Sequence, residues 1–141
     1  MPNRRYRFSV LAISLVLIHF TGSLTQASEA QEKVLFLIKD ADRLVASNIL
    51  FSRFDELKMS AKEEIVQQEV AEAVAVVVTN QRIIAYGAYA PGWQSERLIA
   101  NERVESIQAE DSSVQVVTSD RLLSFYGRRG SWAITKRSIE R

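Results

Sequence analysis

The chain has 141 residues, of which 47% are hydrophobic and 25% are charged, an ordinary balance for one globular domain. It contains no cysteine, which excludes disulfides, thiol nucleophiles and cysteine-ligated metals. The single histidine, His19, lies close to the N-terminus. The rest of the chain therefore lacks the base or ligand of histidine-assisted hydrolases and common zinc sites. We expect no catalytic residue of these kinds, no metal site and no cofactor.

The first 27 residues have the pattern of a secretory signal peptide. Arg4, Arg5 and Arg7 give a positive start, and Phe8 to Phe20 is an apolar segment of 13 positions. Residues 25–27 form a small-residue cleavage pattern, and we expect cleavage after residue 27. A membrane-spanning helix needs about 20 apolar residues, so an uncleaved anchor is the second choice. The mature chain is then expected in the periplasm or outside the cell, with no stable membrane span.

The charge of the mature chain bears on its partners. Residues 28–141 hold 15 basic and 17 acidic side chains, a net charge of −2. Nucleic-acid binding needs a concentrated positive surface, so nucleic acid is not the expected partner.

Residues 28–141 contain one unit that recurs at a constant spacing of 39 residues. Residues 37–46, 76–85 and 115–124 align without gaps. The positions matched by this spacing include Arg43, Arg82 and Arg121, and likewise Phe54, Trp93 and Trp132. We therefore divide the domain into units of about 35–73, 74–112 and 113–141, of which the last is incomplete.

The middle unit shows the expected secondary structure most clearly. Residues 74–78 are apolar and mostly β-branched, residues 80–81 favour a turn, and residues 82–89 alternate with a period of two. Further strands are predicted at residues 93–99 and 104–109. Each unit should thus have four strands, from a buried first strand to a polar fourth. Residues 56–73 are rich in Ala, Glu, Lys and Gln, so a helix there is the alternative.

This all-β pattern resembles β-propeller-type repeats. The resemblance rests on Val-Val-Thr, a two-residue turn, Arg-Leu-Leu-Ser-Phe and Gly-Ser-Trp within residues 116–132, and on residues 35–110. It implies propeller-like blades, but closed propellers usually have about four to eight. Either two chains form a six-bladed ring, or three units close as a β-trefoil. The strand missing from the last unit would come from residues 28–33 or from another chain.

A second resemblance concerns one hairpin. Residues 78–84 read Val-Thr-Asn-Gln-Arg-Ile-Ile, which resembles strand hairpins of bacterial pleckstrin-homology-like domains. The constant spacing of 39 favours the repeat fold instead, because the pleckstrin-homology-like fold is not an internal triplicate.

The repeated arginines are the first candidate ligand-binding residues. Arg43, Arg82 and Arg121 begin the second strand of each unit, where a guanidinium could line a central channel and bind a carboxylate or phosphate. The favoured alternative is that each pairs with a nearby acid such as Glu63 or Glu102, because repeated positions usually encode the packing of the repeat.

Aromatic residues are the second set of candidates. Trp93 and Trp132 each follow another aromatic residue by seven positions and could form a ligand platform, although packing between units is favoured. The loop from Tyr89 to Trp93 is apolar and contains a proline, which makes it the best candidate for a protein contact. Arg128-Arg129 lies in a glycine-flanked loop and is expected to be solvated.

These features favour an exported, non-catalytic binding or scaffold module that acts through protein contacts and forms a homo-oligomer. Three alternatives stay open. They are a sugar-binding, lectin-like module, a hydrolase or lyase that uses Asp, Glu, Arg or Tyr, and a pleckstrin-homology-like envelope module.

Overall fold

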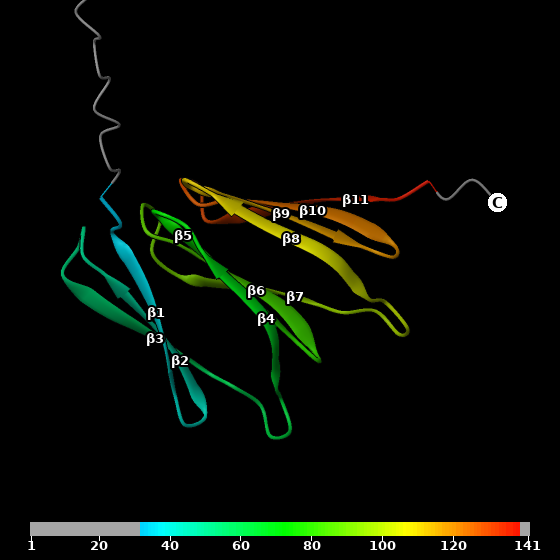
Figure 1. Cartoon of the computed structure of the whole chain (residues 1–141), viewed down its shortest axis with the longest axis horizontal. Helices are drawn as coiled ribbons and strands as arrows, with labels where there is room; N and C mark the ends of the chain where they lie inside the picture. The colour runs from blue at the N-terminus through cyan, green and yellow to red at the C-terminus, as the bar shows by residue number, and fades with distance from the viewer. Residues whose placement is uncertain (1–31, 139–141) are drawn as a thin grey trace, which may run out of the picture.

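A computed structural model describes residues 32–138, and all regular structure in this range is β-strand. The strands form three antiparallel sheets, each a meander of strands consecutive in the chain (Figure 1). The first sheet contains β1 (Leu35–Asp40), β2 (Arg43–Asn48) and β3 (Arg53–Lys58). The middle sheet contains β4 (Ile65–Val70), β5 (Val74–Thr79), β6 (Arg82–Gly87) and β7 (Trp93–Arg97). The last sheet contains β8 (Val104–Glu110), β9 (Ser113–Thr118), β10 (Arg121–Tyr126) and β11 (Ser131–Lys136).

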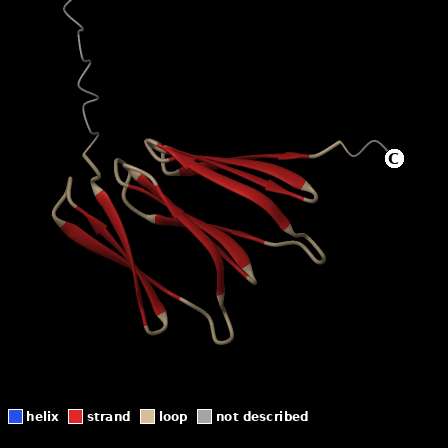
Figure 2. Ribbon diagram, in the orientation of Figure 1, coloured by secondary structure: helices blue, strands red, loops and turns tan. Residues whose placement is uncertain are grey.

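The three sheets stack face to face, with the middle sheet between the other two (Figure 2). Val74 and Val76 of β5 pack against the last sheet, whereas Ala75 and Val77 pack towards the first. Alternate side chains of a strand point to opposite faces, and both faces of β5 are covered. This explains why β5 is buried at every position and why its sequence does not alternate between apolar and polar residues.

The predicted all-β fold is confirmed, and so is its 39-residue spacing, because Arg43, Arg82 and Arg121 begin β2, β6 and β10. The helix alternative for residues 56–73 is wrong, since this range holds the end of β3 and all of β4. β4 is an edge strand with several exposed side chains, and its pairing with β5 overrides the helix propensity of Glu and Gln.

The sheets are shifted by one strand relative to the predicted units. β4 pairs with β5 and β8 pairs with β9, so the fourth strand of each unit belongs to the next sheet. The short turn at residues 71–73 closes a hairpin, whereas the longer segment 59–64 crosses between sheets. The last unit holds three strands, β9 to β11, as expected. Because each fourth strand joins the next sheet, the three-stranded sheet within residues 32–138 is nevertheless the first one. In the first sheet, the position equivalent to β4 is residues 26–31, which lie outside the described range.

The expected rise in polarity from the first to the fourth strand holds in the middle unit, where β5 and β6 are buried and β7 and β8 are largely exposed. It fails in the first unit, where β1 is more exposed than β2. In the middle sheet, β5 and β6 are both buried, whereas the edge strands β4 and β7 are both largely exposed. Burial follows from the central position of a strand in its sheet, because central strands are covered by the neighbouring sheets.

The strand pairing does not fit a β-trefoil. A trefoil barrel needs strands of the three units to pair with one another around a closed barrel, but strands in residues 32–138 pair only within three separate sheets. No helix in the described range is long and apolar enough to cross a membrane. The predicted signal peptide, residues 1–27, lies outside the described residues, as do residues 28–31 of the predicted strand donor.

Candidate functional site

Three equivalent turns lie at one end of the sheet stack and form the most exposed candidate site (Figure 1). They connect β2 to β3, β6 to β7 and β10 to β11, and their central residues are Leu50, Tyr89 and Arg128, each 39 positions apart. We call this surface the turn end and define it as residues 49–51, 88–92 and 127–130. The framework repeats in all three sheets, but the turn residues differ in size and charge.

The first of these turns is strongly apolar. Ile49, Leu50 and Phe51 are 54%, 45% and 55% exposed, so three consecutive large hydrophobic side chains contact solvent. The turn is held in place by its backbone, because the Ile49 N–H donates to the Val34 carbonyl at 2.9 Å. Burial of these side chains would remove apolar area from water, at about 25 cal/mol per Å².

The second and third turns contact each other. The guanidinium of Arg128 lies over the ring of Tyr89, 4.5 Å from its centroid, a cation–π arrangement. Both residues line a polar hollow of about 150 Å³ together with Glu72, Asp111 and Ser112. Tyr89 is 37% exposed, so the predicted contact residue is accessible at the surface.

Backbone hydrogen bonds join the three sheets next to the turn end. The Val34 N–H donates to the Glu72 carbonyl at 3.0 Å, and the Ala73 N–H donates to the Asp111 carbonyl at 2.9 Å. Glu72 and Ala73 lie in the turn between β4 and β5 of the middle sheet. Val34 directly precedes β1 of the first sheet, and Asp111 lies between β8 and β9 of the last sheet, so each bond joins two sheets. The turn end is therefore a fixed surface rather than three independent loops.

Arg82 and Arg121, two of the predicted ligand-binding residues, are occupied within the chain. Arg82 donates to both carboxylate oxygens of Glu63, at 2.7 and 3.0 Å, and its Nη2 also donates to the Lys58 carbonyl at 3.2 Å. Arg121 repeats the arrangement with Glu102 at 2.9 and 2.8 Å and with the Arg97 carbonyl at 2.9 Å. Each arginine thus ties its own sheet to the end of the preceding one.

The two carboxylates at these clusters are ionised well below the usual range. Burial disfavours their charge, but hydrogen bonds from the arginine, from a backbone N–H and from a threonine hydroxyl outweigh it, together with the arginine charge. The pKa of Glu63 is lowered to about 2, with Arg82, Ser60 and Thr79 as donors. The pKa of Glu102 is lowered to about 2 in the same way.

Arg43 differs from its two equivalents. It donates to Glu56 at 2.8 Å and to Asp40, both in the first sheet, and its side chain is 42% exposed. It bridges no second sheet within residues 32–138. The expected pairing with a nearby acid is therefore observed for all three arginines, but the carboxylate of Arg43 comes from its own sheet.

Trp93 and Trp132 are partly buried and pack between sheets. Their rings lie 5.1 Å, centroid to centroid, from Tyr86 and Phe125 respectively. The indole N–H of Trp93 donates to the Asp55 carbonyl at 3.1 Å, across the interface with the first sheet. These rings are engaged within the chain, so the lectin alternative gains no support from them.

Polar side chains of the first and middle sheets meet at a buried position. Asn48 donates to the Tyr86 hydroxyl at 3.2 Å and to the Ala88 carbonyl at 2.8 Å, and the Tyr86 hydroxyl donates to Asp55. Burial, and then the hydrogen bond to Asp55, raises the pKa of Tyr86 to about 12. Because Tyr86 is fully buried, this network fixes the interface between two sheets.

Within residues 32–138, no group of three acidic or histidine side chains is placed to hold a metal ion. The turn end contains residues singled out from the sequence, Tyr89 and the pair Arg128-Arg129, and a cluster that sequence reasoning missed, Ile49 to Phe51. The missed signal was available, because three large hydrophobic residues lie between the predicted strands. The 39-residue spacing also aligns them with the turns at Tyr89 and Arg128.

Comparison with known proteins gives little beyond this geometry. No protein-family model matches the chain, and no curated protein matches it. Among solved structures, the chain is similar to the N-terminal domain of Nup159, with a TM-score of 0.41 and 17% sequence identity. The match covers 77% of this chain and 29% of that chain, so this chain spans less than a third of that structure.

Proposed function

We propose that this chain is an exported, non-catalytic binding or scaffold module that acts through a protein contact at its turn end. The observation that carries the proposal is the exposure of Ile49, Leu50 and Phe51 on a turn whose backbone is fixed. Tyr89 and Arg128 at the equivalent turns add an aromatic ring and a guanidinium. Aromatic residues and arginine are enriched at the centres of protein–protein interfaces, where a few residues carry most of the affinity.

The test compares proteins captured from an envelope extract by the immobilised exported chain and by two variants. Leu50→Asp places a charge at the centre of the apolar turn, and we expect it to lose the captured partner. Val66→Asp is the matched control, because Val66 is 69% exposed but lies on the edge strand β4, outside the turn end. It should retain the partner.

Two outcomes would count against this function. Capture that is the same for wild type and Leu50→Asp would show that the turn end is not the contact. Binding of the wild type to lipid vesicles, with loss of binding in Leu50→Asp and no captured protein, would assign the surface to a membrane instead.

A further inference from the structure

The two outer faces of the sheet stack differ, and together they point to an association between copies of the chain. We call the face of a sheet that points to the preceding sheet in the chain its front face, and the opposite face its back face. The stack in residues 32–138 leaves two faces uncovered, the front face of the first sheet and the back face of the last. Neither face includes the residues of the turn end proposed above to bind a partner.

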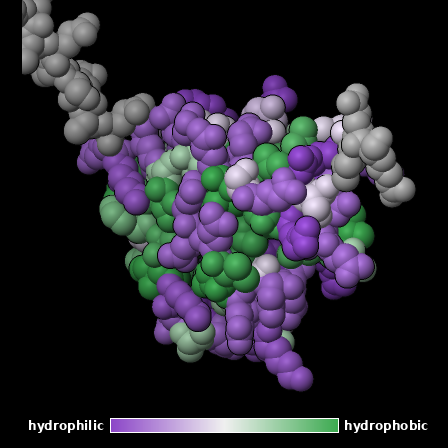
Figure 3. Space-filling view, turned by 45° about the vertical axis from the view of Figure 1, so that its right-hand side comes forward, coloured by the Kyte–Doolittle hydropathy of each residue, from purple (hydrophilic) through white to green (hydrophobic). Residues whose placement is uncertain are grey.

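The front face of the first sheet is apolar and exposed. Phe36, Ile38 and Phe54 are 45%, 46% and 67% exposed. They are three of the twelve exposed large hydrophobic side chains in the described range. On the side of the molecule seen in Figure 3, hydrophobic surface also lies between hydrophilic side chains. Soluble monomers rarely expose contiguous apolar patches of more than a few hundred Å². A face of this kind needs a partner surface.

The two interfaces inside the chain show what such a front face binds. Across β5, β6 and β7, one cross-strand row of the middle sheet is Ala75, Tyr86 and Trp93; the equivalent row of the last sheet is Val114, Phe125 and Trp132. Each row packs on the back face of the preceding sheet.

The first sheet carries the same kind of row at the same repeat position, formed by Phe36, Ser47 and Phe54. In this row the first aromatic ring belongs to Phe36 of β1, whereas in the middle sheet it belongs to Tyr86 of the second strand, β6. Phe54 of β3 is aromatic, like its equivalent Trp93. Ile38 and Val45 are also on this face. In the middle sheet their equivalents are the aliphatic residues Val77 and Ile84. This face is therefore built as an interface of the same type, but it has no preceding sheet in the described residues.

The back face of the last sheet keeps two of the positions that receive such a row, whereas Ser113 and Gln115 stand where the middle sheet has Val74 and Val76. Ala46 and Ala85 are the small residues on the back faces of the first and middle sheets that pack in the clusters with the aromatic rows, and Ser124 is their equivalent. Leu122 takes the place of Leu44 and Ile83 and is 43% exposed.

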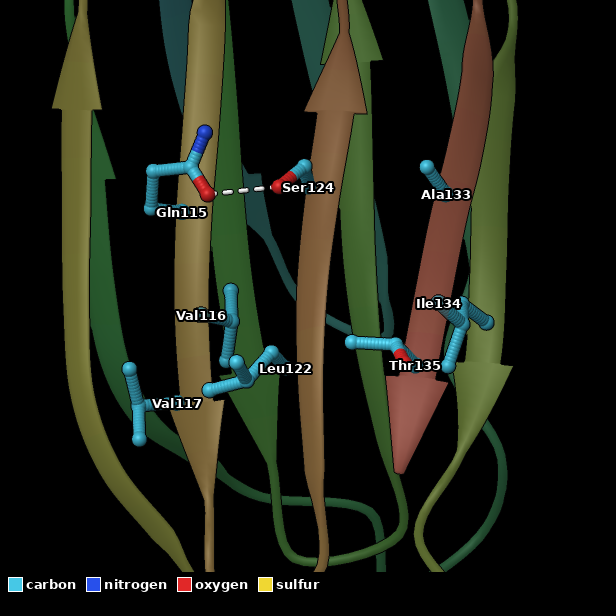
Figure 4. Close-up of a pocket in the computed structure, with 8 residues that line it drawn as sticks. All are labelled: Gln115, Val116, Val117, Leu122, Ser124, Ala133, Ile134 and Thr135. Carbon is cyan, nitrogen blue, oxygen red and sulfur yellow. Dashed lines mark hydrogen bonds between the residues drawn. The ribbon is translucent and has the colours of Figure 1, made fainter. Parts of the chain in front are cut away.

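Leu122 and Ser124 line a groove of about 310 Å³ on the outer surface of β9, β10 and β11 (Figure 4). Its floor includes Val117, Leu122 and Thr135, and Ser124 donates to Gln115 at one end. Its mixed polarity suits a surface that is also exposed in the free chain.

We infer that the front face of the first sheet docks on the back face of the last sheet of a second copy of this chain. Because the same two faces are free on the partner, the contact forms twice and closes a ring of two chains with six sheets, within the usual range for propellers. In this ring Arg43 gains what Arg82 and Arg121 already have, a preceding sheet to bridge.

The inference is tested by the mass of the exported chain in solution, measured by light scattering over a range of concentrations. We expect a dimer for the wild type. Phe36→Glu disrupts the front face and Leu122→Lys disrupts the back face, and each alone should raise the dissociation constant by a factor of about 30 or more. Val66→Glu is the matched control, because Val66 is 69% exposed on β4 and lies on neither outer face, so it should remain a dimer.

Mixing the two disrupted variants gives the decisive result. One junction then joins two unaltered faces and the other brings the introduced acid against the introduced base, so the mixture should recover the dimer. A wild-type monomer, a larger open assembly, or a dimer that Leu122→Lys leaves intact would each overturn the inference. The last result would indicate contact between two front faces. Circular dichroism and melting temperature verify that each variant is folded. Failure of this test leaves the turn-end proposal untouched, because that proposal uses a different surface.

Discussion

At the scale of single residues, the repeated Glu–Arg clusters contribute most clearly to the fold. The carboxylate of Glu102 is inaccessible to solvent and is bonded by Arg121, Thr118 and the Ile99 N–H. Its counterpart Glu63 has the same partners one repeat earlier. In both cases the acid lies in the linker between two sheets, so the cluster fixes the place where the chain crosses from one sheet to the next.

We predict that Glu102→Gln lowers the free energy of unfolding by on the order of 2 to 4 kcal/mol, because it leaves Arg121 without its counter-charge at a largely buried position. Urea unfolding followed by circular dichroism measures the change. Glu56→Gln is the control, because its pair with Arg43 is exposed on both sides and should be worth no more than about 1 kcal/mol. Equal losses in the two variants would contradict the assigned role of the buried cluster.

At the scale of secondary-structure elements, the close approach of the middle and last sheets depends on two glycines. A Cβ atom added to Gly87 at the end of β6 would lie 2.4 Å from the carbonyl oxygen of Gly127, which is backbone and cannot rotate away. Gly127 in turn donates its N–H to the Ser112 carbonyl at 2.8 Å. The ends of β6 and β10 can therefore meet only without a side chain at position 87.

We predict that Gly87→Ala destabilises the chain by about 1 to 3 kcal/mol, because the added methyl group forces the two sheets apart. The melting temperature reports the loss, and hydrogen exchange should show faster exchange at residues 87–92 and 127–130 than elsewhere. Unchanged stability of Gly87→Ala would show that the sheets separate at no cost.

At the scale of the whole molecule, the two buried carboxylates make stability depend on pH. Their pKa in the folded chain is about 2, against an ordinary value of 4.5. A lowered folded-state pKa stabilises the fold above the unfolded pKa, and this contribution is lost as pH falls towards the folded pKa.

We therefore predict that the contribution of these groups to the free energy of unfolding is constant above about pH 5.5, where they are ionised in both states, and falls as the pH is lowered from there to about 2. Urea unfolding at a series of pH values measures it. The double variant Glu63→Gln with Glu102→Gln should start less stable and show a much weaker dependence in this range. The same slope in wild type and double variant would assign the acid sensitivity to other groups.

The sequence by itself determined the all-β class, the 39-residue spacing and the strand positions, because β-branched runs, turns and period-two alternation are local properties of the chain. It also indicated the pairing of Arg82 and Arg121 with Glu63 and Glu102, since these pairs recur with the repeat. Local patterns could not show which strands share a sheet. β4 pairs with β5 across the short turn at residues 71–73, which is where two predicted units meet.

Only the tertiary structure decided what covers each face. Phe36 and Ala75 occupy equivalent positions in the repeat, yet one is 45% exposed and the other fully buried. The difference is not in the residue but in whether a preceding sheet is present, which depends on the stacking of segments far apart in the chain. For the same reason the sequence could not show whether Ile49 to Phe51 are buried. In the folded chain they lie on a turn at the end of the stack and are exposed.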